Sequence, residues 1–155
     1  MAAPHIIDRF YEAFARRDAA AMALCYHPEA LFEDPVFGPL DREAVCAMWA
    51  MLLSRSADLA VTHQILTDNG PLVIAHWEAR YSFSRTGRPV HNRITATFTL
   101  EDGLIRTHRD RFSFWAWARQ AFGPLGLLVG WTPWFQSTVQ RDAQRLLAHF
   151  QAKRT

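Results

Sequence analysis

The segment Glu33-Asp34-Pro35 places a carboxylate at the end of a short apolar run. The run predicts a strand over residues 31–34, and the proline that follows favours extended backbone at Asp34 while supplying no N–H donor. A carboxylate in such a position can act as a general base when it faces a pocket. It can equally accept backbone hydrogen bonds in the turn over residues 36–40, as aspartates in turns often do. The sequence leaves both interpretations of Asp34 open.

His108 and Asp110 form a second candidate group on a predicted strand over residues 104–114. Period-two alternation places both on the face that ends in aromatic residues. If this face meets the core, each polar side chain costs about 1–3 kcal/mol unless it is hydrogen-bonded. The two residues then form either an acid–base pair opposite Asp34 or a buried polar pair that pins the sheet to the first helices. They face outward instead if the alternation is displaced by one residue.

Apolar faces of the predicted helices and strands supply candidate ligand contacts. Tyr81 and Asn92 lie on such faces, where they either orient a ligand carbonyl or are simply half-buried near a sheet end. The candidate ligand contacts are Phe10, Phe14, Tyr81, Asn92 and Phe112. The histidines lack metal-ligand spacing, so neither a metal site nor a cofactor is expected.

Hydrophobic periodicity predicts the elements that must position these residues. Apolar side chains at three- and four-residue spacing predict a helix over residues 6–17, and Asp18 and Asp41 are predicted to cap two further helices. Turn signals such as Asp68-Asn69-Gly70-Pro71 separate four predicted strands. These strands cover residues 59–68, 71–84, 90–100 and 104–114. Helices, a short strand, a helix and then an antiparallel meander indicate an α+β domain over residues 1–114.

An aromatic-rich extension over residues 115–155 follows this domain. Glycine and proline interrupt its apolar stretch, which is therefore too short to cross a bilayer, and a final helix is predicted over residues 136–150. Three roles stay open for the extension: packing on its own domain as a lid, a homodimer interface, or a basic helix on a membrane surface. Packing or dimerisation is favoured, because an aromatic patch of this size is seldom left in water.

Composition narrows the function classes. The chain has 155 residues, half of them apolar, and a net charge of only +2. It shows no basic patch interleaved with aromatic residues, so a nucleic-acid partner is not expected. Cys25 and Cys46 sit in apolar, helix-like surroundings and are predicted to be reduced packing residues. With no secretion signal visible, a cytoplasmic location is expected.

The pattern of Arg9-Phe10-Tyr11-Glu12, Asp18, Tyr26 and Glu33-Asp34-Pro35 resembles the N-terminal part of bacterial ketosteroid isomerases. Over residues 5 to about 114 the element order resembles the cone-shaped fold of nuclear transport factor 2 and the SnoaL-like polyketide cyclases. This resemblance implies a curved sheet wrapped around helices, with a deep apolar pocket open to solvent at its mouth. It also implies that Asp34 is the general base that moves a proton between carbon atoms.

The chain departs from the isomerases at the groups that stabilise the oxyanion. The position of their tyrosine falls on Phe10, and that of their aspartic acid falls on Thr95 or Ala96. Phe10 and Ala96 cannot donate a side-chain hydrogen bond, and losing such donors costs orders of magnitude in rate. Efficient ketosteroid isomerisation is therefore not expected. The Asp-Arg-Asp arrangement of limonene epoxide hydrolases is also not evident.

Two functions remain. The first is a cofactor-free enzyme that acts on an apolar carbonyl compound with Asp34 as base and with His108 and Asp110 as auxiliary groups. The second is a non-catalytic module that binds an apolar ligand or another protein in the same cone. Convergence of Asp34, His108 and Asp110 in one cavity favours the enzyme, and side chains that point to separate surfaces favour the binding module.

Overall fold

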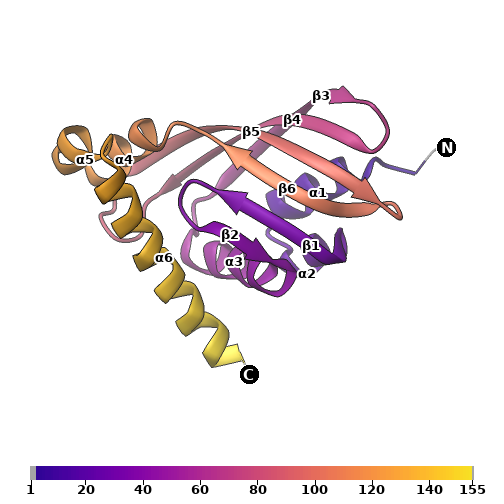
Figure 1. Cartoon of the computed structure of the whole chain (residues 1–155), viewed down its shortest axis with the longest axis horizontal. Helices are drawn as coiled ribbons and strands as arrows, with labels where there is room; N and C mark the ends of the chain where they lie inside the picture. Colours follow the sequence, from indigo (N-terminus) through magenta and orange to yellow (C-terminus); the bar gives the residue numbers. More distant parts are fainter. Residues whose placement is uncertain (1–2, 155) are drawn as a thin grey trace.

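The computed structural model describes residues 3–154; Met1, Ala2 and Thr155, at the ends of the two predicted regions, lie outside the described residues. The described chain folds into one curled sheet with helices packed against it and a long helix at the C-terminus (Figure 1). This arrangement confirms the predicted α+β class. The helices are α1 (Ile6–Ala15), α2 (Ala19–Leu24), α3 (Arg42–Arg55), α4 (Phe114–Phe122), α5 (Pro124–Val129) and α6 (Pro133–Arg154). The strands are β1 (Tyr26–Asp34), β2 (Gly38–Asp41), β3 (Ala60–Asp68), β4 (Leu72–Ser82), β5 (Pro89–Glu101) and β6 (Leu104–Arg111).

The sheet has the strand order β2-β1-β6-β5-β4-β3. Strands β3 to β6 form the predicted antiparallel meander, and β1 joins it by pairing parallel to β6. The first strand begins five residues earlier than predicted, at Tyr26. The turn that follows it is shorter than the predicted turn over residues 36–40, because β2 already begins at Gly38. Gly38, with φ at +70°, lets the chain reverse at once, so that Asp34 and Gly38 pair across β1 and β2.

Two predicted helix caps are confirmed. The side chain of Asp18 accepts a hydrogen bond from the Ala21 N–H at 3.0 Å, and that of Asp41 accepts one from the Ala44 N–H at 2.8 Å. Each bond satisfies a donor that the first helical turn leaves free. The cap at Asp41 starts α3, whose far end reaches the site described below.

Of the two orientations that the sequence left open for the last strand, the structure shows the inward one. His108 is 1 % exposed and Asp110 is 3 % exposed, and they are the buried polar or charged side chains of the described core. In β4 the alternation places Val73, Ala75, Trp77 and Ala79 on the same side, all buried.

The C-terminal extension is divided between buried and exposed apolar side chains. Phe114, Trp117 and Ala118 of α4 form a buried cluster with Phe135 and Val139 of α6. From the end of the molecule that holds α4 and α5, α6 runs past α3 (Figure 1) and is longer than the predicted helix over residues 136–150. By contrast, five large side chains around α5 are 52–70 % exposed: Leu125, Leu127, Leu128, Trp131 and Trp134. Among the described helices, none is long and apolar enough to span a bilayer.

Deleting residues 115–155 is expected to cause aggregation or a clear fall in the melting temperature. Phe135, Val139 and Leu147 are buried, and a large apolar side chain that is fully buried contributes about 1.5–3 kcal/mol to stability. Thermal unfolding followed by circular dichroism measures the effect, with deletion of residues 153–155 as the control that keeps the packing. A truncated chain that stays soluble at the same melting temperature contradicts the prediction.

Candidate active site

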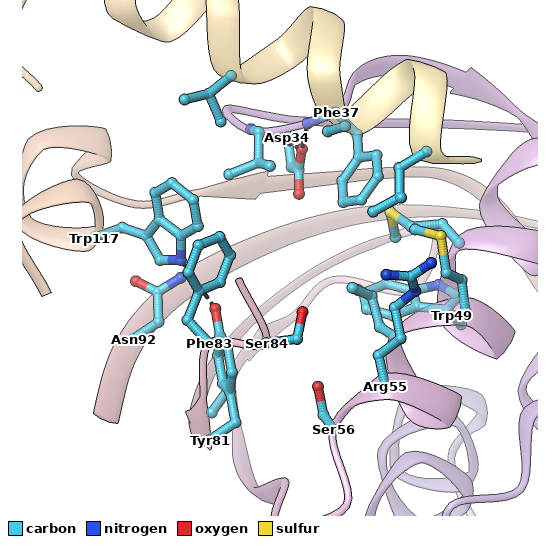
Figure 2. Close-up of a pocket in the computed structure, with 18 of the residues that line it drawn as sticks. Asp34, Phe37, Trp49, Arg55, Ser56, Tyr81, Phe83, Ser84, Asn92 and Trp117 are labelled. Atoms are coloured by element: carbon cyan, nitrogen blue, oxygen red, sulfur yellow. Dashed lines mark hydrogen bonds between the residues drawn. The ribbon is translucent and has the colours of Figure 1, made fainter. Parts of the chain in front are cut away.

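A cavity of about 790 Å³ opens between the inner face of the sheet, α3 and α6. Its walls are mostly apolar and aromatic, a composition typical of small-molecule sites. Figure 2 shows the labelled side chains around it, with Asp34 under α6, Tyr81, Asn92 and Trp117 on one side, and Arg55 and Trp49 on the other. Three carboxylates line it: Asp34 and Asp110 from the sheet, and Asp142 from α6.

Asp34 meets the geometric requirement of both interpretations that the sequence left open. Its Oδ1 accepts hydrogen bonds from the N–H groups of Val36 at 3.0 Å and Phe37 at 2.6 Å, as in an aspartate-capped turn. The same carboxylate faces into the cavity (Figure 2). Because the turn bonds occupy Oδ1, Oδ2 is available to a ligand.

Three glutamines of α6 hold the opposite side of this turn. The amide groups of Gln136 and Gln140 donate to the carbonyl of Pro35 at 3.2 and 3.0 Å, and that of Gln144 donates to the carbonyl of Phe37 at 2.9 Å. Spacing of four residues places these side chains on one face of the helix. The sequence analysis missed this role, although the repeat of glutamine at every fourth residue was a readable signal.

Burial tunes the carboxyl group of Asp34. The pKa of Asp34 is raised to about 7, chiefly by loss of solvent. The negative charge of Asp110 contributes to this rise in pKa, and the backbone N–H groups of Phe37, Val36 and Gly38 oppose it. A carboxyl group with a pKa near 7 is an effective proton acceptor and donor at neutral pH.

A chain of buried hydrogen bonds orients Asp110. Its Oδ1 accepts from the indole N–H of Trp77 at 3.2 Å and lies 2.9 Å from His108 Nε2. On the other side of the imidazole, His108 Nδ1 lies 2.8 Å from the hydroxyl of Tyr26, which accepts from the indole N–H of Trp49 at 2.9 Å. All these groups are satisfied when Tyr26 donates to Nδ1 and His108 carries its proton on Nε2, so we assign that tautomer.

Tyr81 and Asn92 supply uncharged donors to the cavity. The indole N–H of Trp117 donates to the hydroxyl oxygen of Tyr81 at 2.9 Å (Figure 2), which leaves the hydroxyl proton free for a ligand. Burial raises the pKa of Tyr81, so the hydroxyl keeps this proton at neutral pH. The amide of Asn92 lines the cavity and makes no hydrogen bond to another described residue.

The structure sorts the predicted site residues into two layers. The cavity wall holds Asp34, Asp110, Phe14, Tyr81, Asn92 and Phe112. Phe10 and His108 lie one layer deeper. Phe10 is 0 % exposed and packs edge-on against His108 and Trp49 instead of facing the cavity, because the first helix turns this ring toward the centre of the core. The sequence analysis did not identify Trp49, Arg55 or Trp117 as part of the wall.

Other ligating groups are dispersed. Among residues 3–154, no three His, Cys, Asp or Glu side chains are grouped so that they could hold a metal ion. Cys25 and Cys46 are free thiols, and burial raises the pKa of each.

Comparisons with known proteins agree with this fold. Residues 7–108 match the SnoaL-like domain family. A protein of Catenulispora acidiphila with a ketosteroid isomerase-like fold, solved with trimethylamine, superposes with a TM-score of 0.68 at 16 % identity, covering 85 % of this chain and all of that one. IdmH of Streptomyces antibioticus, assigned as a polyketide cyclase, gives a TM-score of 0.62 at 25 % identity over 78 % and 96 % of the two chains. TerC, crystallised with polyporic acid, gives 0.66 at 17 % identity over 76 % and 96 %. A comparison with curated protein sequences gives no match.

The raised pKa of Asp34 predicts an unusual dependence of stability on pH. An unfolded aspartate has a pKa of about 3.9, so between about pH 4 and 7 the folded chain binds more protons than the unfolded chain. The contribution of Asp34 to the free energy of unfolding is therefore fully present below about pH 4 and is lost as the pH rises through 7. Asp34→Asn keeps the Oδ1 acceptor of the turn and is expected to flatten this fall.

Urea unfolding at pH 5, 6, 7 and 8 measures the slope. Asp102→Asn is the matched control, because Asp102 is exposed and its positive φ suits asparagine. An Asp34→Asn slope equal to that of the wild type contradicts the prediction.

Proposed function

The chain belongs to the SnoaL-like domain family, and from this premise we propose that it is a cofactor-free enzyme that moves a proton on an apolar carbonyl compound. One observation carries the proposal: two carboxylates, Asp34 and Asp110, share one apolar cavity with the uncharged donors Tyr81 and Asn92. Members of this fold differ widely in chemistry, so the proposal rests on these side chains and not on the fold.

In the proposed reaction, Asp34 removes a proton from a carbon next to the substrate carbonyl. The C–H electron pair becomes the enolate double bond, and the carbonyl π electrons move onto the oxygen. The hydroxyl of Tyr81 and the amide of Asn92 donate hydrogen bonds to this developing oxyanion. Where the enolate is conjugated with a further double bond, return of the proton from Asp34 to the far carbon of that system shifts the double bonds, re-forms the carbonyl and gives an isomer. Attack of the enolate carbon on a second carbonyl of the same substrate gives a ring, and the new alkoxide takes the proton.

Asp110 is the second proton-transfer group in this proposal, and His108 is a positioning residue that acts through it. The imidazole lies behind the cavity wall and contacts the carboxylate at 2.9 Å. Two N–H donors on Oδ1 fix the orientation of Asp110 and leave Oδ2 toward the cavity.

The free thiols of Cys25 and Cys46 support the proposal that the protein acts in the reducing cytoplasm.

The alternative function is a non-catalytic module that binds an apolar ligand or another protein. The co-crystal of TerC with polyporic acid supports small-molecule binding in this fold without requiring turnover here. The position of two carboxylates against apolar walls favours the enzyme, because buried carboxylates are costly and a purely apolar binding site does not need them.

Deuterium exchange tests the proposed reaction without a known substrate. In D2O, the wild type is expected to exchange the α-protons of some members of a panel of cyclic and aryl ketones, measured by NMR. The rate should rise with pH and level off above about pH 7, as Asp34 loses its proton. Asp34→Asn is expected to slow exchange by about 10²–10⁴-fold. A steroid β,γ-enone should show at most traces of isomerisation, because Phe10 is buried where the isomerases have a tyrosine on the first helix, and the donors Tyr81 and Asn92 come instead from β4 and β5.

Asp102→Asn is the control and should exchange at the wild-type rate. Equal exchange by the wild type and Asp34→Asn contradicts the assigned base. Exchange by neither, together with tight ligand binding, favours the non-catalytic module.

A second copy of the chain is the proposed partner of the exposed apolar tip, which consists of Leu125, Leu127, Leu128, Trp131 and Trp134. Residues 120–140 contain no charged side chain, so the tip offers an uncharged surface to a copy of itself.

Light scattering after gel filtration is expected to give a dimer of the 17.8 kDa chain, and the double variant Trp131→Ser/Trp134→Ser is expected to give a monomer. Leu24→Ser, which changes an equally exposed leucine outside the tip, should remain dimeric. A monomeric wild type contradicts this interface, and a monomer that sediments with lipid vesicles favours a membrane role.

A further inference from the structure

The two ends of the cavity carry opposite charge. The carboxylates Asp34 and Asp110 lie at the inner end, where Asp110 is 3 % exposed. The exposed end of the lining holds Arg55, Arg85 and Arg145, against the single carboxylate of Asp142.

Two of these arginines have no ion-pair partner among the described residues. Arg85 pairs with Asp142 at 3.5 Å, which neutralises one positive charge. Arg55 and Arg145 form no ion pair or hydrogen bond with another described residue. They come from different elements, the end of α3 and the middle of α6, yet both line the same cavity. Figure 2 shows Arg55 reaching toward the cavity from α3, with the hydroxyl groups of Ser56 and Ser84 near the same opening.

We propose that the ligand of this cavity is an apolar carbonyl compound with a carboxylate or similar anionic group at one end, which Arg55 and Arg145 bind. This inference rests on the proposed function for the carbonyl end but not for the anionic end. The carboxylates at the inner end repel an anion, and the guanidinium groups at the mouth attract it. Such a ligand therefore enters in one orientation, with its anionic group at the mouth and its apolar carbonyl end beside Asp34.

In this proposal, the charge separation gives the site selectivity among apolar compounds. Aromatic walls attract any apolar molecule of suitable size and give little selectivity, because each added methylene group is worth about the same wherever it lies. An anionic group placed at a fixed distance from the carbonyl adds a requirement for both charge and length.

A pair of fluorescent probes tests the proposal independently of turnover. The anionic probe 8-anilinonaphthalene-1-sulfonate and the neutral N-phenyl-1-naphthylamine have nearly the same aromatic frame and differ in the sulfonate. The wild type is expected to bind the anionic probe more tightly, with an affinity that falls as salt increases. The double variant Arg55→Gln/Arg145→Gln is expected to weaken the anionic probe about tenfold and to leave the neutral probe unchanged.

Arg141→Gln is the matched control, because Arg141 lies on α6 one turn from Arg145 and does not line the cavity. Circular dichroism checks that each variant is folded, and the salt dependence of the wild type provides a second readout that needs no variant. Equal affinity of the wild type for both probes overturns the proposal. An affinity for the anionic probe that is the same in the wild type and the double variant also overturns the proposal. This result is expected if the probe binds the exposed tip instead. If the wild type shows no deuterium exchange but binds the anionic probe selectively, the proposed enzyme activity is contradicted and the proposed anion site is supported.

Discussion

The turn between β1 and β2 depends on hydrogen bonds from two directions, and the candidate site depends on this turn. Asp34 Oδ1 accepts the N–H groups of Val36 and Phe37, while glutamine amides of α6 bind the carbonyls of Pro35 and Phe37. With donors and acceptors both engaged, the backbone has little freedom, and the free oxygen of the carboxylate keeps its direction. The same bonds hold α6 over the cavity. The C-terminal extension and the candidate base therefore belong to one structural unit.

Aromatic residues with a polar atom resolve the conflict between an apolar core and buried charge. Trp77 donates an N–H to Asp110, and Trp49 donates one to Tyr26 of the hydrogen-bond chain, while their rings form the cavity wall. These residues give apolar area and a directed donor at once. With phenylalanine in place of Tyr26 and Trp77, His108 and Asp110 would keep their bond to each other but each would lose its aromatic partner, at a cost of about 1–3 kcal/mol for a group left unsatisfied. The polar pair and its aromatic neighbours are thus a matched set.

Periodicity predicted most of the elements and placed His108 and Asp110 on one shared face of the last strand, because alternation is a local property of the sequence. It left open whether that face points inward. The missed strand β2 has only four residues and includes Pro39, so it carries almost no alternation to detect. The bonds that complete the site join distant segments, such as Tyr26 with His108 and Trp117 with Tyr81, and no local pattern encodes them. The depth of Phe10 was unpredictable for the same reason: a helical face specifies burial and not which cavity the ring meets.

Burial raises the pKa of both the candidate base Asp34 and the candidate donor Tyr81, and each rise suits the role proposed for that residue. It raises the pKa of Asp34 to about 7, which makes its carboxylate a stronger base than an exposed aspartate. It also raises the pKa of Tyr81, so the hydroxyl stays protonated and can donate to an oxyanion. The negative charge of Asp34 also raises the pKa of Tyr81, with a smaller effect than burial. Proton removal would neutralise Asp34 and create negative charge on the substrate oxygen. The effect of Asp34 that raises the pKa of Tyr81 would then disappear, so the tyrosine hydroxyl would become a stronger hydrogen-bond donor when the oxyanion forms. One apolar enclosure can therefore support both halves of a proton transfer, without requiring separate environments for the base and the donor.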